Sequence, residues 1–96
     1  MKLSYEGICN RAGWEKAGVT LPQFDWKEMV AATDEAPTWV HIGAGNIFRA
    51  FIAHAQQNLL NAGLVKSGIV AVSTHNAYII NKVYKPYYNM CVLVGL

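Results

Sequence analysis

The spacing of apolar residues changes along the middle of the chain and predicts strands that alternate with helices. Residues 38–42 (TWVHI) form a run of mainly β-branched and aromatic side chains, which is typical of a strand buried on both faces of a parallel sheet. From residue 46 to residue 60 the apolar positions recur every three or four residues, which predicts a helix, and Gly63 is a suitable terminator for it. Residues 68–73 (GIVAVS) predict a second buried strand.

The alternation continues toward the end of the chain. Residues 76–84 predict a short helix, residues 85–89 (KPYYN) predict a turn, and residues 90–96 (MCVLVGL) predict a third strand. The order strand, turn, helix, strand, helix, strand is a βαβαβ unit, and right-handed crossovers make the strands of such a unit parallel. The sequence therefore predicts an α/β fold.

An arm and a helix precede this unit. Residues 1–24 contain scattered glycines and polar residues and predict an arm with one helical turn near residues 11–17. Asp25 is followed three residues later by Glu28, which is the spacing of a capping box at the start of a helix. We expect this helix to end at about Thr33.

The composition is that of one small domain. The chain has 96 residues, of which 53% are hydrophobic and 15% are charged. Its apolar runs are far shorter than the roughly 18–20 residues of a membrane span, and residues 1–16 lack the apolar core of a secretory signal. Cys9 and Cys91 lie at opposite ends of the chain and form no disulfide framework, which favours a reduced, cytoplasmic location.

Charge is distributed unevenly along the chain. All six carboxylates lie within residues 1–35 together with four basic residues, so the net charge of that segment is −2. Residues 36–96 contain four basic residues and no acid, so their net charge is +4. A segment without carboxylates favours an anionic ligand, although four charges are too few to indicate a nucleic-acid surface.

Two glycines lie where the first strand is predicted to meet its helix. Gly43, Ala44 and Gly45 end the strand and open the helix, which is the setting of a dinucleotide-binding fingerprint. The first glycine permits a tight turn, and the second leaves no side chain where a pyrophosphate would approach. The helix then directs free N–H groups at that phosphate, and Asn46 is a candidate cap. An ordinary tight turn between strand and helix remains the alternative explanation.

The pattern departs from the full fingerprint at two points. Phe48 occupies the position of the third glycine, and no acid follows the second strand to bind the adenosine ribose. Ser73, Thr74, His75 and Asn76 offer hydroxyl, imidazole and amide groups there instead. Thr74 and His75 are our candidates for cofactor contact, because strand ends in such sheets face the ligand crevice. A solvent-exposed loop histidine is the alternative for His75, and the choice between NAD and NADP stays open.

Other kinds of site are not favoured. The three histidines and two cysteines match no metal-ligand spacing, HExxH and CxxC are absent, and His41 is expected to be a hydrogen-bonded strand histidine. GxSxG and GxxxxGK[ST] are absent, which argues against a hydrolase triad and a phosphate-loop NTPase. The tyrosines of residues 84–88 could stack on single-stranded nucleic acid, but tyrosines around a proline turn favour packing. We therefore predict no metal, nucleic-acid or membrane partner.

The motif HIGAGNIFRAF, together with WEKAG…LPQFD, PTWV and YKPYYNMCVLV, resembles the mannitol dehydrogenase family of long-chain polyol and sugar-acid dehydrogenases, most closely its sugar-acid branch. In that branch a phenylalanine at the third-glycine position is usual. The resemblance implies a partial Rossmann-type domain that binds NAD(H). It implies that Arg49 lies near the cofactor or the domain cleft, and that the phosphate turn is formed by Gly43, Ala44, Gly45, Asn46, Ile47 and Phe48.

Members of this family carry their catalytic lysine in a later helical substrate domain, in a pattern similar to Lys-x-x-x-x-Asn-x-x-His. Neither Lys66, Lys82 nor Lys85 is followed by that pattern, so we assign no catalytic residue to this chain. The implied organisation is an arm and capped helix over residues 1–37 and the start of the dinucleotide-binding domain over residues 38–96, with the substrate domain absent.

The implied function is the NAD-binding opening of an oxidoreductase that moves a hydride to or from a sugar acid, inactive on its own. The alternatives are a truncated or decayed remnant without turnover and a related mannitol or polyol dehydrogenase. A short parallel sheet with one face partly bare leaves an apolar edge at residues 90–96. We therefore expect the isolated chain to be marginally stable and to associate with itself.

Overall fold

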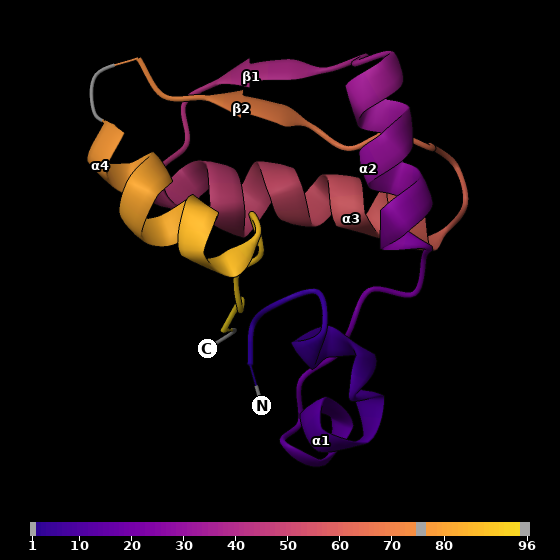
Figure 1. Cartoon of the computed structure of the whole chain (residues 1–96). Helices are drawn as coiled ribbons and strands as arrows, with labels where there is room; N and C mark the ends of the chain where they lie inside the picture. The colour runs from indigo at the N-terminus through magenta and orange to yellow at the C-terminus, as the bar shows by residue number, and fades with distance from the viewer. Residues whose placement is uncertain (1, 75–76, 95–96) are drawn as a thin grey trace. The chain divides into compact units, whose positions relative to one another are not determined.

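The glycine turn lies in a unit formed by residues Pro22–His75, which we call the central unit. The two ends of the chain, Met1–Leu21 and Asn76–Leu96, form a second unit, the terminal unit. The structure is a computed structural model that describes residues 2–74 and 77–94 (Figure 1).

The central unit begins with helix α2 (Trp26–Glu35), whose start is fixed by Asp25. The backbone of Asp25 is extended, and its carboxylate accepts hydrogen bonds from the N–H groups of Lys27 at 3.0 Å and Glu28 at 3.2 Å. A carboxylate at this position satisfies N–H groups that have no partner in the helix and also favours the positive end of the helix dipole. The predicted cap is therefore confirmed.

Strands β1 (Val40–Ile42) and β2 (Val70–Val72) pair in parallel and confirm the two predicted strand positions. His41 lies opposite Ala71 in the register. The pairing extends by one hydrogen bond at each end, from the Val70 N–H to the Trp39 carbonyl at 2.9 Å and from the Gly43 N–H to the Val72 carbonyl at 2.7 Å. The glycine turn is thereby joined to the carboxyl end of β2.

The helix between the strands begins at Asn46, widens into a π-helical segment (Phe48–Ile52) and continues as α3 (Ala53–Asn61). It ends as predicted at Gly63, which has a positive φ of 73°. The buried amide of Gln56 donates to the Ser67 carbonyl at 2.8 Å, so this polar side chain is satisfied within the core. This bond fixes the helix to the chain that leads into β2.

Helix α2 is fastened to the same connection. The Thr33 hydroxyl donates to the Met29 carbonyl at 2.7 Å and accepts the Gly68 N–H at 2.8 Å. Gly68 is buried, and a Cβ atom there would lie 2.7 Å from the Met29 sulfur. A side chain at this position would therefore displace the flexible Met29 side chain from its place between α2 and the start of β2.

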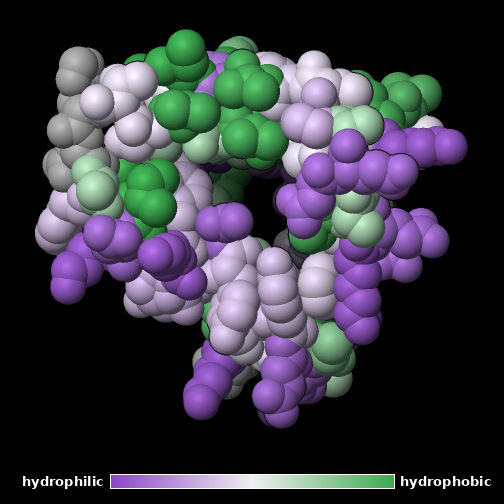
Figure 2. Space-filling view, turned by 45° about the horizontal axis from the view of Figure 1, so that its top comes forward, coloured by the Kyte–Doolittle hydropathy of each residue, from purple (hydrophilic) through white to green (hydrophobic). Residues whose placement is uncertain are grey.

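One face of the sheet is uncovered, contrary to the prediction of strands buried on both faces. His41 and Ala71 are half-buried on one side, whereas the alternate residues on the other side are exposed. Figure 2 turns this side toward the viewer and shows hydrophobic residues gathered over the strands. The exposed fractions on what we call the bare sheet face are 57% for Val40, 71% for Ile42, 37% for Val70 and 36% for Val72.

In the terminal unit, α1 (Arg11–Lys16) confirms the helical turn predicted near residues 11–17. The Asn10 side chain caps it by accepting from the Gly13 N–H at 3.4 Å. Trp14 is buried, and its indole N–H donates to the Gly7 carbonyl at 2.9 Å, so the helix is anchored to the turn that precedes it.

The later part of the terminal unit begins with α4 (Ala77–Ile79) and continues as a π-helical segment (Ile80–Tyr84) and a 3₁₀ turn (Lys85–Tyr87). The predicted helix is thus confirmed over its described residues, 77–84. Tyr88 and Asn89 then adopt left-handed conformations with φ of 54° and 62°.

The predicted third strand is wrong for residues 90–94, which are irregular; residues 95 and 96 lie outside the described part. A strand is held by hydrogen bonds to a neighbouring strand, and residues 90–94 pair with neither β1 nor β2. The apolar character of MCVLV therefore does not produce a sheet edge. Across the described residues the observed unit is βαβ, an α/β arrangement with a two-stranded parallel sheet.

Replacing Asp25 by alanine removes the cap of α2 and should lower the free energy of unfolding by about 1 kcal/mol. Asp34→Ala is the matched control, because Asp34 lies in the last turn of the same helix, where a negative charge is unfavourable. We expect this control to leave stability unchanged or slightly raised. Urea unfolding followed by circular dichroism measures both, and an equal loss in the two variants would contradict the assigned cap.

The bare sheet face should promote self-association, because exposed apolar surface of this kind is removed from water when two molecules meet. Ile42→Thr should weaken association about tenfold, since it removes a large apolar side chain and retains a β-branched one. Val94→Thr is the control, because Val94 is 74% exposed but lies in the irregular segment. Sedimentation velocity over a concentration series measures this, and an equal effect of both substitutions would show that the sheet face is not specific.

Candidate functional site

The glycine turn, Gly43–Gly45, directly follows β1 and precedes the helix that leads into α3. Gly43 has a φ of +126°, a conformation that other residues rarely adopt, and its N–H is bonded to β2. A Cβ atom on Gly43 would lie 3.6 Å from the His41 ring. The backbone conformation therefore requires glycine at this first position.

Each carbonyl of the turn accepts a hydrogen bond from the chain itself. The Gly43 carbonyl lies 3.1 Å from His41 Nδ1, which donates to it. The Ala44 carbonyl accepts from Arg49 Nη1 at 2.9 Å, and the Gly45 carbonyl accepts from the Arg49 backbone N–H at 3.2 Å. The negative ends of three consecutive peptide dipoles are thus directed at groups of the protein. Such an arrangement disfavours a cation and leaves the turn suited to an anion.

The helix after the turn begins at Asn46. The bond from the Arg49 N–H to the Gly45 carbonyl is an early i to i−4 bond of this helix, so the N–H groups before Arg49 have no acceptor within it. The predicted role of Asn46 as the cap is wrong. Asn46 is itself helical, and its side-chain oxygen accepts from Arg49 Nη2 instead.

Gly45, the second glycine, differs from the first. It is exposed, its φ is not positive, and no heavy atom lies within 4 Å of the place where a Cβ would be. Neither the backbone conformation nor packing within the described residues requires a glycine here. The open space over Gly45 is where a ligand can reach the main chain without meeting a side chain.

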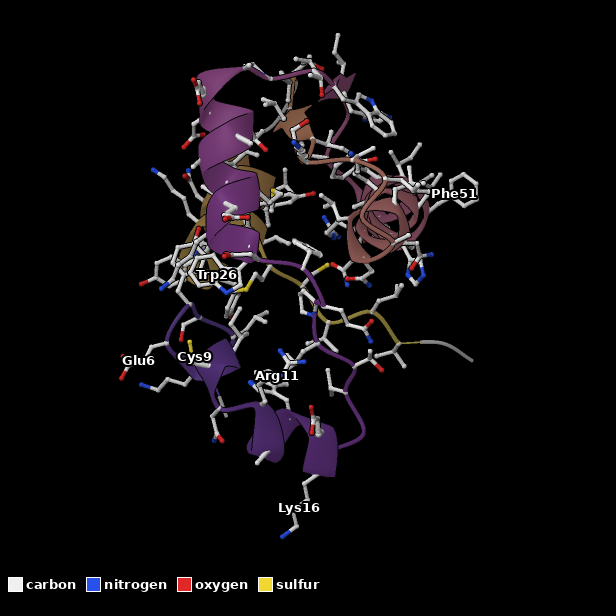
Figure 3. All side chains as sticks on the ribbon, turned by 90° about the vertical axis from the view of Figure 1, so that its right-hand side faces the viewer. Glu6, Cys9, Arg11, Lys16, Trp26 and Phe51 are labelled. Atoms are coloured by element: carbon white, nitrogen blue, oxygen red, sulfur yellow. The ribbon has the colours of Figure 1, made fainter. Side chains whose placement is uncertain are left out.

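Phe48, at the third-glycine position, is a core residue. Its side chain is 7% exposed, and its ring lies 5.0 Å from the His41 ring, centre to centre, tilted by 38°. A glycine at this point lets a helix pack closely on its strand. Here the helix and the strand meet through the rings of Phe48 and His41 instead. Ile47, by contrast, is 80% exposed, and Phe51 is 70% exposed and points away from the helix (Figure 3).

Thr74, one of the two predicted contacts after β2, lies at the same edge of the sheet as the turn. Ser73 is half-buried and Thr74 is exposed, and both follow Val72, whose carbonyl accepts from Gly43. His75 lies outside the described residues. Thr74 thus follows the carboxyl end of β2, to which the N–H of Gly43 is bonded, as expected for a parallel pair.

The carboxylates of the central unit all belong to α2 or to its cap residue. Figure 1 shows α2 beside the beginning of β1, at the opposite end of the strands from the turn. Arg49 is half-buried at the turn itself. The turn thus combines one positive side chain with a helix start and has an environment suited to an anion.

A separate hollow of about 270 Å³ lies between α2 and the far end of α3. None of the predicted site residues lines it. Its lining residues are Phe24, Asp25, Glu28, Met29, Ala32, Leu60, Val65 and Lys66.

The described residues contain no group of three or more side chains placed to hold a metal ion, and none of their helices is long and apolar enough to cross a membrane. Tyr84 is buried, whereas Tyr87 and Tyr88 are about half exposed. The three tyrosines therefore do not share one open stacking surface.

Sequence reasoning identified the turn but not the groups that fasten it. His41 was expected to be hydrogen-bonded, and it is, but its acceptor at Gly43 was not predicted. Arg49 was expected to lie near the cofactor or the domain cleft, but its two side-chain hydrogen bonds, to the Ala44 carbonyl and the Asn46 side chain, were not predicted. The sequence signal that could have indicated these bonds is short separation, because His41 and Arg49 each lie within five residues of the groups that accept their hydrogen bonds.

No family model and no solved structure gives a significant match to the chain. A D-mannonate oxidoreductase from Thermotoga maritima is 48% identical to it over 96 residues, which is the whole of this chain. The chain spans 18% of the length of that relative. The resemblance that the glycine motif indicated is thus confirmed: the whole chain matches the N-terminal part of a D-mannonate oxidoreductase.

Proposed function

We propose that the glycine turn and the start of the following helix bind the pyrophosphate of NAD(H). The chain would then be the cofactor-binding opening of a Rossmann-type domain in an oxidoreductase that acts on sugar acids. The residues assigned to the cofactor are Gly43, Ala44, Gly45, Asn46, Ile47, Phe48, Arg49, Thr74 and His75.

The inward bonding of the three turn carbonyls is the observation that carries this proposal. A pyrophosphate is repelled by carbonyl oxygens and attracted by N–H groups, so a turn that binds it must direct its carbonyls elsewhere. Here His41 donates a hydrogen bond to the Gly43 carbonyl. Arg49 donates hydrogen bonds to the carbonyls of Ala44 and Gly45. The open space over Gly45 supplies the room that a phosphate needs against bare main chain.

The assigned residues differ in what they contribute. Phe48 is buried and can offer only its main chain, while its ring supports the helix against His41. Thr74 can donate a hydroxyl to a ribose at the end of β2. Arg49 supplies positive charge beside the turn. When bound, the nicotinamide would supply hydride transfer, which no side chain of the chain can perform.

The substrate class follows from the relative, whose name specifies D-mannonate as its substrate. We infer that the hydride moves between nicotinamide and a keto or hydroxy carbon of an open-chain sugar acid. The lysines of this chain lack the Lys-x-x-x-x-Asn-x-x-His pattern of the family's catalytic lysine. The proton transfer and the substrate contacts are therefore assigned to the portion of such an enzyme that this chain does not span.

Binding of NADH should depend on the open space at Gly45. Gly45→Val should raise the Kd for NADH at least about tenfold, because the new side chain occupies the approach of the pyrophosphate. Its unfolding midpoint should not change, since no atom lies near the new side chain. Fluorescence titration, including the quenching of Trp39, measures the affinity.

Two variants serve as controls for this measurement. Ala55→Val adds a valine to an exposed position on α3 and should leave NADH affinity unchanged. Gly43→Ala should instead lower the free energy of unfolding by about 1–3 kcal/mol, because it strains the backbone at a positive φ. Unaltered NADH affinity in Gly45→Val would remove the turn from the site, and a wild-type chain that does not bind NADH would refute the proposed function.

The chain of 96 residues should bind the cofactor without turnover. With D-mannonate and NAD we expect no formation of NADH above background, because the chain has no lysine in the family's catalytic pattern. The D-mannonate oxidoreductase of Thermotoga maritima is the positive control. NADH formed by this chain in proportion to its concentration would show that its own residues suffice for catalysis.

A further inference from the structure

Arg49 contacts three consecutive residues of the turn and the helix start. Its Nη1 donates to the Ala44 carbonyl at 2.9 Å, its backbone N–H donates to the Gly45 carbonyl at 3.2 Å, and its Nη2 donates to the Asn46 side chain. The side chain thus folds back along its own helix toward the turn. We propose that Arg49 is a positioning residue that holds the glycine turn in its anion-binding conformation before the cofactor arrives; this inference rests on the proposed function.

The turn needs such a fastening because of its sequence. Gly43 and Gly45 have the widest conformational freedom of any residue type, so fixing their backbone costs more conformational entropy than fixing that of other residues. If the turn were mobile in the free protein, part of the cofactor's binding free energy would be used to order it. A turn already held by the protein avoids that loss.

The chemistry of arginine suits this task. A guanidinium is planar and presents parallel N–H donors, so it can bond to two acceptors at a fixed separation. In Arg49 these acceptors are a main-chain carbonyl before Gly45 and a side-chain oxygen after it, so the side chain bridges the glycine. A lysine keeps the charge but has no such fork and cannot hold both acceptors in one plane.

The turn is also held from the strand side. His41 donates to the Gly43 carbonyl and packs on Phe48, so the first residue of the turn is fixed from β1. Arg49, which follows the turn in the sequence, bonds to the next two residues of the turn and to Asn46 at the helix start. Loss of Arg49 should therefore loosen the turn from Ala44 onward and leave Gly43 in place.

The test compares Arg49→Lys with Arg11→Lys, the same substitution at an exposed arginine of the terminal unit. Asn46→Ala is a second variant, which removes one of the two side-chain acceptors and leaves the arginine. NADH and ADP are titrated into each protein, since both contain a pyrophosphate, and hydrogen exchange of the amides of residues 43–48 is measured without ligand. Exchange in α2 reports whether the fold is intact.

Arg49→Lys should raise the Kd for both ligands about tenfold, the factor expected for one charge-assisted hydrogen bond. Exchange across residues 44–48 should become faster in the free protein, while exchange in α2 stays as in the wild type. Asn46→Ala should change both quantities in the same direction by a smaller factor, and Arg11→Lys should change neither. A merely structural role would raise exchange in α2 together with the turn.

Several outcomes would overturn the inference. Weaker binding with wild-type exchange at the turn would mean that Arg49 contacts the cofactor directly, and wild-type affinity in Arg49→Lys would mean that it is not needed. Failure of the wild-type chain to bind NADH would refute the proposed function instead. In that case exchange at residues 44–48 in Arg49→Lys still decides whether Arg49 holds the turn.

Discussion

The parallel pairing of β1 with β2 is the constraint on which the central unit depends. Parallel neighbours cannot be joined by a hairpin, so the chain must cross back over the sheet, and the helix from Asn46 to Asn61 makes that crossing. The crossing places the end of β1, the end of β2 and the start of the helix at one edge. The hydrogen bond from Gly43 to Val72 extends the pairing into the turn. The position of the candidate site thus follows from two strands of three residues each.

The turn itself is organised by contacts close in sequence. His41 reaches two residues forward and Arg49 reaches back to residues 44 and 46, so these side-chain contacts add local fastening to the bond between Gly43 and β2. Such local contacts form without a long loop closure, which keeps their entropic cost small. Phe48 completes the arrangement by filling the space between helix and strand that a third glycine would close. An aromatic residue can therefore occupy the third-glycine position here because its ring is buried against the His41 ring.

Features set by local chemistry could be predicted from the sequence. The cap at Asp25, the end of the helix at Gly63 and the positions of both strands each depend on a few neighbouring residues, and the structure has all of them. The third strand could not be predicted correctly, because a strand must pair within a sheet, and residues 90–94 have the apolar pattern but do not belong to the β1–β2 sheet. Burial of the sheet on both faces failed for a similar reason, since it depends on what covers the strands. At the turn, the spacing of the glycines indicated the candidate site. The side-chain conformation in which Arg49 bonds to Ala44 cannot be predicted from residue spacing.

The π-helical segment Phe48–Ile52 has a consequence for the way this helix is phased. An α-helix advances about 100° per residue, so four residues exceed a full turn by about 40°, and side chains four apart drift around the axis. A π turn contains more residues, so four of them fall short of a full turn instead. One wide turn followed by α3 cancels much of the drift, and Phe48, Gln56 and Leu60 are all buried although they are multiples of four apart. The helix thereby keeps Phe48, Gln56 and Leu60 on its buried side with the half-buried Ile52 between them, whereas a uniform α-helix of this length would spread these positions farther around its axis.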